Sequence, residues 1–380
     1  MTRRRRRPPN ISAQIQHESR ILRYHGLEPI GQLSHTAMRT LVEMVQSRHT
    51  DRWAERHARG EVPDAWPYGL NRLAAHGIEP VWSPRRAGLA EGLGRAVTKA
   101  AGVRLLEGWT APARSIDARL CWDERTGIPA ALDRRTRGIP VVSGTIWATD
   151  PEAPKRVRML LRAALQRQDL IVFAISLGQL APLREMTPAR VQYLPFGVDP
   201  DFWRASEDPD PRSRMVVSAG NDRHRDFGTL IGGALKDPRN RLTLASSAQI
   251  SDVNRLEVGP RTHVQLRGLF YDANVVSVAT HPNDHCSGLT TTLEAMSCGR
   301  PVVATRTPGM EDYVDDGVTG ILVPPGDAEA LAAAVGQLLD DPARARAMGA
   351  AGAERVRDRF TTEHLASALA GLLKEATTRG

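Results

Sequence analysis

In HPNDHCSGLTTTLEAMSCGRPVVAT, residues 281–305, a polar loop leads into a helix and the helix into a strand. The loop ends at Ser287 and Gly288, and Gly299 with Pro301 ends the helix before an apolar run of strand length. A helix start presents unpaired backbone N–H groups and the positive end of the helix dipole, which together suit a phosphate group. The stretch therefore predicts an α/β domain with an anion site at this helix start.

A purely structural interpretation of the same helix start competes with this one. Thr291 and Glu294 have the spacing of a capping box, in which Glu294 only satisfies backbone groups of the helix. Spacing alone favours the cap, so the role of Glu294 stays open at this point.

Strand-length apolar runs alternate with helical segments outward from this stretch. We expect strands at residues 40–45, 78–82, 118–122, 139–143 and 170–175 in the first half, and at 215–218, 302–305 and 321–323 in the second. Such alternation implies parallel strands with crossover connections. The predicted fold is therefore α/β, with two Rossmann-like domains that face a cleft.

Domain boundaries follow from the interruptions of this pattern. We predict an N-terminal extension at 1–38, a first Rossmann-like domain at 39–195, a linker at 196–211, a second Rossmann-like domain at 212–360 and a last helix at 361–380. The polar residues 46–64 are expected to form a functional loop, and Asp327 and Asp341 to cap helices.

Composition restricts the class of protein. The chain has 380 residues, enough for two domains, with 41% apolar and 25% charged residues, as in a globular enzyme. No apolar run is long enough to span a bilayer, and the arginine block at 3–7 is not followed by the apolar segment of a signal peptide. We expect a cytoplasmic protein without an integral membrane segment.

Neither the charged residues nor the cysteines predict a nucleic-acid, metal or nucleophilic site. The formal charge is +8, and five of these charges lie in the block 3–7, which is more typical of a solvated tail than of a nucleic-acid site. The three cysteines, Cys121, Cys286 and Cys298, lack metal-ligand spacing and a paired base, so we predict no metal site and no thiol nucleophile.

The stretch 281–305 resembles the signature of the retaining GT-B glycosyltransferases, in particular family 4, the group 1 glycosyltransferases. In that family, two glutamates separated by seven residues contact the donor sugar and the ribose hydroxyls. Glu294 matches the second glutamate, whereas Cys286 stands at the position of the first. A subgroup with a small residue there has the pattern Pro-Asn-x-His-x-Ser-Gly, which this sequence matches at Pro282, Asn283, His285, Ser287 and Gly288.

The resemblance extends to VVSAGNDRHRDFGTL, residues 216–230, which is similar to the family's phosphate loop. Arg225 stands at the usual lysine position and Arg223 is a second candidate to neutralise the diphosphate leaving group, although a surface salt bridge is the structural alternative for both. The resemblance implies a nucleotide-diphosphate sugar as co-substrate, a UDP-sugar being favoured, and no other cofactor. It also implies that the domain at 39–195 binds the acceptor, that the domain at 212–360 binds the nucleotide sugar, and that the last helix, 361–380, crosses back onto the first domain. The residues expected to bind this donor are Gly220, Arg223, Arg225, His285, Ser287, Gly288, Leu289, Thr290 and Glu294.

In the first domain the candidate residues follow predicted strands, where open α/β sheets place their ligands. Asp123 and Glu124 are candidates to accept the proton of the acceptor hydroxyl, with a helix cap as the alternative. The family's histidine after a later strand is replaced by GTIWATD. The acceptor-binding candidates are Arg52, His57, Glu61, Trp147 and Asp150.

These patterns predict a glycosyltransferase, more narrowly a hexosyltransferase, that retains anomeric configuration. The acceptor is expected to be a small molecule, a lipid-linked compound or a saccharide, in natural-product (for example antibiotic) or polysaccharide biosynthesis. Two alternatives remain: another enzyme of the same fold, such as a nucleotide-sugar epimerase or a phosphorylase, and a non-catalytic sugar-nucleotide-binding partner. The sequence does not indicate the oligomeric state.

Overall fold

The strands form two sheets in which every pairing is parallel. This computed structural model describes residues 37–44, 50–82, 115–150, 155–167, 169–250 and 253–379. The predicted extension 1–38 lies almost wholly outside the described residues, and 38–380 form one compact unit. Within that unit each sheet has six strands, so the prediction of two α/β domains is confirmed.

The first sheet has the strand order β2-β1-β3-β4-β5-β6. Its strands are β1 (Met38–Glu43), β2 (Ile78–Trp82), β3 (Ala118–Cys121), β4 (Val141–Gly144), β5 (Leu170–Ala174) and β6 (Arg190–Tyr193). Both faces of the sheet are buried: Val172 belongs to one core cluster and Phe173 to another. This explains the continuous apolar runs, because side chains alternate between the two faces of a strand and helices cover both.

The second sheet has the order β12-β11-β10-β7-β8-β9. Its strands are β7 (Met215–Ala219), β8 (Arg241–Ala245), β9 (Leu256–Val258), β10 (Val275–Val278), β11 (Val302–Thr305) and β12 (Ile321–Val323). The chain winds outward from β7 to β9 and then returns to place β10 on the other side of β7. β7 and β10 therefore flank the point at which the winding reverses, where open parallel sheets bind ligands beyond their carboxyl ends.

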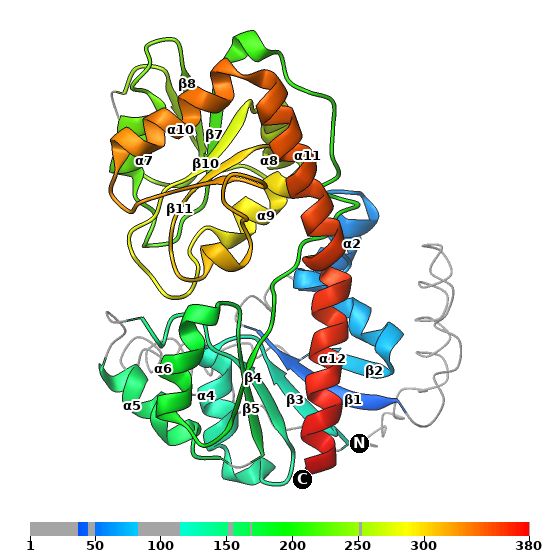
Figure 1. Cartoon of the computed structure of the whole chain (residues 1–380). Helices are drawn as coiled ribbons and strands as arrows, with labels where there is room; N and C mark the ends of the chain where they lie inside the picture. The colour runs from blue at the N-terminus through cyan, green and yellow to red at the C-terminus, as the bar shows by residue number, and fades with distance from the viewer. Residues whose placement is uncertain are drawn as a thin grey trace, which may run out of the picture. The chain divides into compact units, whose positions relative to one another are not determined.

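Helices connect the strands and cover the sheets (Figure 1). The α-helices are α2 (Thr50–Ala58), α4 (Glu124–Leu132), α5 (Lys155–Ala164), α6 (Leu180–Met186), α7 (Phe227–Ala234), α8 (His263–Asp272), α9 (Leu289–Ser297), α10 (Ala328–Asp340), α11 (Pro342–Arg359) and α12 (Thr362–Arg379), and a 3₁₀ segment, η2, spans Pro67–His76. Asp327 and Asp341 cap α10 and α11 by accepting backbone N–H bonds, as predicted. The stretch 46–64 is only partly the expected loop: within its described part, 50–58 form α2, and 59–64 are turns and bends.

Helix α12 packs against η2 and against strands β3 to β5 (Figure 1). The turn into this helix is held by the segment that follows β6: Val198 N–H donates to Phe360 C=O, and Thr362 N–H donates to Val198 C=O. The end of the chain thus belongs to the core of the first sheet, in line with the crossing expected from the family. None of the described helices has the length and apolar composition needed to cross a membrane.

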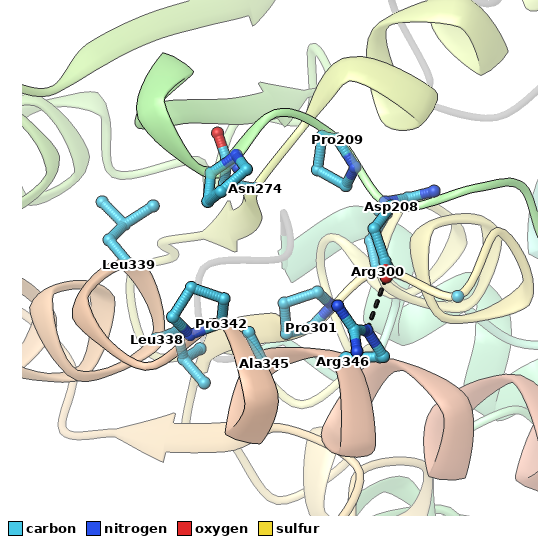
Figure 2. Close-up of a pocket in the computed structure, with 12 residues that line it drawn as sticks. Asp208, Pro209, Asn274, Arg300, Pro301, Leu338, Leu339, Pro342, Ala345 and Arg346 are labelled. Carbon is cyan, nitrogen blue, oxygen red and sulfur yellow. Dashed lines mark hydrogen bonds and ion pairs between the residues drawn. The ribbon is translucent and has the colours of Figure 1, made fainter.

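Two arginines of the second domain, Arg300 and Arg346, bind the predicted linker at 196–211. Arg300 Nη2 donates to the carbonyls of Ser206 (3.2 Å) and Glu207 (2.6 Å), and Arg346 Nε binds Asp208 at 2.5 Å. Figure 2 shows the small pocket around this junction, where Asp208 lies beside Arg346. Since the arginine contacts go to the chain's own backbone and carboxylate, we interpret this pocket as part of the linker's attachment.

Candidate functional site

Two loops and one helix start meet beyond the carboxyl ends of β7 and β10. One loop, 220–226, follows β7, and the other, 279–288, follows β10 and leads into α9. The antiparallel bridge between Arg225 and Thr280 joins the two loops. The position is the reversal point of the second sheet, so the topology alone marks it as the candidate ligand site.

Helix α9 begins without a side-chain cap. Its N-cap is Gly288, in the left-handed region with φ 85°, and Leu289 is the first helical residue. The capping-box interpretation of Thr291 and Glu294 is wrong, because Glu294 is then the sixth helical residue, whereas the box needs the third. Thr291 Oγ1 instead donates to Ala219 C=O at 3.1 Å. Leu289 N–H donates to Cys286 C=O at 3.1 Å, which leaves the N–H groups of Gly288 and Thr290 for a ligand.

The guanidinium of Arg225 lies beside this helix start. A Cβ placed on Gly288 would lie 2.5 Å from Arg225 Nη1, and a Cβ on Gly220 would lie 3.0 Å from Arg225 Nε, so two glycines make room for the same cation. Arg225 is 5% exposed, and its Nη1 has no hydrogen-bond partner among the described residues. Burial lowers its pKa to about 10, which leaves it charged at neutral pH. The surface-salt-bridge alternative does not hold for this arginine, since its described hydrogen bond is to Ser218 Oγ at 3.5 Å.

Ser287 and His285 come from the loop before α9. Ser287 Oγ donates to Asp222 Oδ1 at 2.8 Å, and Asn283 Oδ1 accepts from Ser287 N–H at 2.8 Å, which orients the loop. His285 Nδ1 lies 2.9 Å from Asp150 Oδ2 and its Nε2 lies 3.5 Å from Asp222 Oδ1. Burial alone would lower the pKa of His285, but the nearby carboxylates of Asp150 and Asp222 raise it to about 9.

Asp150, on the loop after β4, joins the first sheet to this site. Its carboxylate is fully buried, binds His285, and lies 3.4 Å from Arg223 Nη2. Burial acts to raise the pKa of Asp150, but the hydrogen bond and charge of His285 hold it below the usual value. Arg223 itself is half exposed, so the salt-bridge alternative describes its contact in this structure.

Asp150, His224 and His285 also form a group whose ligand atoms lie within 4.8 Å of one another, as a metal site would require. However, the 2.9 Å separation of His285 Nδ1 from Asp150 Oδ2 is a hydrogen-bond distance. A histidine with a raised pKa is protonated, whereas a metal ligand has to be neutral. We therefore interpret the group as a hydrogen-bonded ion pair.

Glu294 lies on α9 more than one turn after the helix start at Leu289. No hydrogen bond from the described residues reaches its carboxylate, and burial raises its pKa to about 8. It lines a pocket together with Thr290, Trp53, Tyr68 and His263. A carboxyl group without partners in a pocket is available to a ligand's hydroxyl groups.

Both candidate catalytic carboxylates have hydrogen-bond partners in the first domain. Asp123 caps α4 and binds Arg125 Nη2 at 2.6 Å, which is the helix-cap alternative. Glu124 accepts the backbone N–H groups of Ile146 and Trp147, both at 2.9 Å, and burial together with the nearby Asp123 raises its pKa to about 7. Of the two, Asp123 lines the pocket that contains His285 and Ser287.

Aromatic residues form the other wall of that pocket. Tyr68 stacks on Trp122 with ring centroids 4.3 Å apart, and the Arg125 guanidinium lies 4.4 Å over the Trp147 ring. Trp147 was predicted from the sequence, whereas Tyr68 was missed because nothing local reveals that it adopts a left-handed φ of 59°. Asp222 was missed too, although it stands in the phosphate-loop motif and its carboxylate orients Ser287.

The acceptor candidates Arg52, His57 and Glu61 lie on and after α2. Arg52 and His57 are exposed, and Glu61 forms ion pairs with Arg56 and Arg59. None of the three lines the pockets that contain Ser287 or Glu294. Their acceptor role stays a prediction.

Cys286 replaces the first glutamate of the family's pair in a constrained position. It is buried with a φ of 58°, and a Cβ on Gly309 would lie 2.7 Å from Cys286 Cβ. Burial raises the pKa of the thiol well above its usual value, so it stays protonated and is unsuited to nucleophilic attack. Cys121 and Cys298 are buried as well.

Sequence comparisons with known proteins match parts of the chain. The family model described as "Glycosyl transferases group 1" matches residues 222–341. A D-inositol 3-phosphate glycosyltransferase of Saccharomonospora viridis is 36% identical over 169 residues, which are 44% of this chain and 36% of that protein. A GDP-mannose-dependent alpha-(1-6)-phosphatidylinositol monomannoside mannosyltransferase of Mycolicibacterium smegmatis is 33% identical over 217 residues, 49% of this chain and 56% of that protein. The matches thus span only part of these relatives.

Solved structures resemble nearly the whole chain at lower identity. A sucrose-phosphate synthase of Thermosynechococcus elongatus has a TM-score of 0.69 at 20% identity, covering 90% of this chain and all of that one. Anabaena HepE in complex with UDP and glucose has a TM-score of 0.62 at 17% identity, with the same coverage. The chain therefore has the GT-B fold, and its residues 222–341 match the family model of the group 1 glycosyltransferases.

Proposed function

We propose that the protein transfers a sugar from a nucleoside diphosphate sugar to an acceptor hydroxyl with retention of anomeric configuration. The observation that carries this proposal is Arg225: a buried guanidinium with an unpartnered Nη1, between Gly220 and Gly288, at the open start of α9. A buried cation without a partner is costly, and a dianionic ligand would relieve that cost.

The donor-side roles follow from position. The backbone N–H groups of Gly288 and Thr290 would hold the diphosphate with Arg225, and Glu294 would bind the ribose hydroxyls. Leu289 N–H and the Ser287 hydroxyl already donate to Cys286 C=O and to Asp222, so these two residues would shape the loop around the ligand. Both Gly220 and Gly288 leave space for this group. A UDP-sugar is the favoured donor, and UDP is the ligand that one structural neighbour holds.

The proposed reaction exchanges one C–O bond for another. The bond from the anomeric carbon to the diphosphate oxygen breaks, and the acceptor oxygen attacks on the same face. The acceptor's proton passes to the departing diphosphate, because Asp123 is bound to Arg125 and Glu124 to two backbone N–H groups. Arg225 and His285 stabilise the negative charge that develops on the diphosphate.

The acceptor is proposed to bind against Trp147 and the wall formed by Tyr68 and Trp122. Arg52, His57 and Glu61 on the α2 side would contact a longer acceptor. A small molecule, a lipid-linked compound or a saccharide would fit this proposal, with natural-product or polysaccharide biosynthesis as the context.

Cys286 supports a second candidate function, a sugar-nucleotide-binding partner without turnover. A buried, protonated thiol replaces the carboxylate that the family uses to contact the donor sugar. Such a protein would keep the diphosphate site at Arg225 and lose the group that orients the sugar.

The test measures binding and turnover on the wild-type protein. Thermal shift and calorimetry with UDP, GDP and ADP report the donor site, and product analysis after incubation with each nucleotide sugar and an acceptor panel reports transfer. We expect binding of one nucleoside diphosphate and transfer with retention. Binding without hydrolysis or transfer would favour the partner function, and absence of binding by all three nucleotides would overturn both.

A further inference from the structure

One carboxylate from the first sheet holds three groups of the second. Asp150 binds His285 Nδ1, lies 3.4 Å from Arg223 Nη2, and lies 3.4 Å from the backbone N of Asp284. Arg223 belongs to the loop after β7, and Asp284 and His285 to the loop after β10. These are the two loops that carry the proposed diphosphate site.

The His285 ring is fixed at one nitrogen and open at the other. It is 4% exposed, and Nδ1 is engaged by Asp150. Its Nε2 has no hydrogen-bond partner among the described residues and is 3.5 Å from Asp222 Oδ1. His285 lines the same pocket as Ser287 and Gly288, so Nε2 is the ring nitrogen left to pair with a donor bound there.

The groups around the ring favour its charged form. Asp150 and Asp222 face it from the two sheets' loops, and Asp284 precedes it in the chain. His224 lies with its ring centroid 4.8 Å away, and the Trp147 ring lies 6.4 Å away. The carboxylates outweigh the burial and the neighbouring histidine, and the pKa of His285 rises to about 9.

We propose that Asp150 is a positioning residue that holds His285 as an imidazolium and turns its Nε2–H toward a phosphate oxygen of the bound donor. The proposal rests on the proposed function, since it needs a diphosphate in this pocket. It gives Asp150 a role other than acceptor binding, and it makes the donor site depend on a residue of the first sheet.

The test compares nucleoside diphosphate affinity at several pH values. Wild-type protein should bind UDP, or whichever nucleotide binds best, with a nearly constant dissociation constant from pH 6 to 8. In Asp150→Asn, the pKa of His285 falls, so the ring is neutral at pH 8 and binding weakens about tenfold, as expected for a lost charge-assisted hydrogen bond. At pH 5.5 the ring is protonated in both proteins and the affinities should converge.

Two further variants and one control make this comparison specific. His285→Gln should bind weakly at every pH, and Asp150→Asn/His285→Gln should bind no more weakly than His285→Gln alone. Asp208→Asn removes one carboxylate at the exposed Arg346 contact and should match wild type. Each variant is compared with wild type in the same buffer, so that the ionisation of the ligand's own phosphate near pH 6 cancels.

NMR titration of the wild type provides a measurement that does not depend on the variants' folding. The His285 imidazole signal, assigned from its loss in His285→Gln, should titrate near pH 9. A signal titrating below pH 7 in wild type, or equal affinities of Asp150→Asn and wild type at pH 8, would overturn the proposal for Asp150. If wild type binds no nucleoside diphosphate at any pH, the proposed function itself fails.

Discussion

The polar groups at the carboxyl ends of the two sheets differ in whether they have hydrogen-bond partners. At the second sheet, Arg225 Nη1 and the Glu294 carboxylate have no hydrogen-bond partner among the described residues, and α9 begins without a side-chain cap. At the first sheet, Asp123 is bound to Arg125, and Glu124 accepts two backbone N–H groups.

The difference indicates where each side's binding free energy comes from. Polar groups left unpaired in the free protein gain partners only when a ligand binds, so the second sheet is prepared for a charged, hydroxyl-bearing ligand. The paired groups of the first sheet fix a loop, and its pocket wall is largely aromatic. Apart from Asp150, which holds His285, we therefore expect substitutions to affect nucleotide affinity at the second sheet and mainly stability at the first.

Substitution of Arg225 should have the largest effect on nucleotide affinity. Arg225→Ala is expected to weaken nucleoside diphosphate binding about 100-fold, because charge-assisted hydrogen bonds to phosphate contribute about 1.5–3 kcal/mol each. Arg225→Lys, which restores the family's usual residue, should recover most of the affinity. Calorimetry measures both, with Arg346→Ala as the exposed control.

The free energy of unfolding should respond in a different way to the same change. The guanidinium has an unsatisfied nitrogen in the free protein, so Arg225→Ala should cost no more than about 1 kcal/mol of stability in urea titrations. A large loss of stability together with unchanged nucleotide affinity would make Arg225 a structural residue.

Gly288→Ala tests whether the open helix start needs glycine for space as well as conformation. A Cβ there would meet Arg225 Nη1 at 2.5 Å and Val278 still closer, so strain and overpacking together should cost about 2–4 kcal/mol. Gly317 is the matched control, with φ 79° and nothing within 4 Å of its Cβ position, and Gly317→Ala should cost about 1 kcal/mol. Equal losses in urea titrations would contradict the close approach at Gly288.

The sequence predicted the class of fold and the motifs of the second sheet because both depend on local patterns. Apolar runs between helices indicated parallel α/β sheets, and the loop-to-helix transition indicated a loop ending at Gly288 and a helix soon after it, which begins at Leu289. The capping box failed because Thr291 and Glu294 have its spacing although the helix starts at Leu289. The contact between Asp150 and His285 joins residues 135 positions apart, and no local pattern specifies it.

The pH dependence of the protein's stability tests whether the Glu294 carboxyl group is buried without a partner. Its folded-state pKa of about 8 lies above the usual value, so between about pH 5 and 8 the unfolded chain binds fewer protons than the folded one. The stability of the free protein should therefore fall as pH rises through this range, by at most about 1.4 kcal/mol per pH unit from this one group. Glu294→Gln should flatten the profile, and urea midpoints at pH 5.5 and 8 measure it. An identical slope in the variant would mean that the carboxyl ionises normally.

Asp123→Asn should have the smallest effect, because asparagine is also a good N-cap and only the ion pair with Arg125 is weakened. We expect unchanged nucleotide affinity, a stability loss of about 1 kcal/mol, and transfer within a few fold of wild type if the departing diphosphate takes the acceptor's proton. Initial rates of transfer measured with saturating donor test this. A rate reduced 100-fold or more at unchanged nucleotide affinity would instead identify Asp123 as the base, and the first sheet would then contribute chemistry as well as a wall.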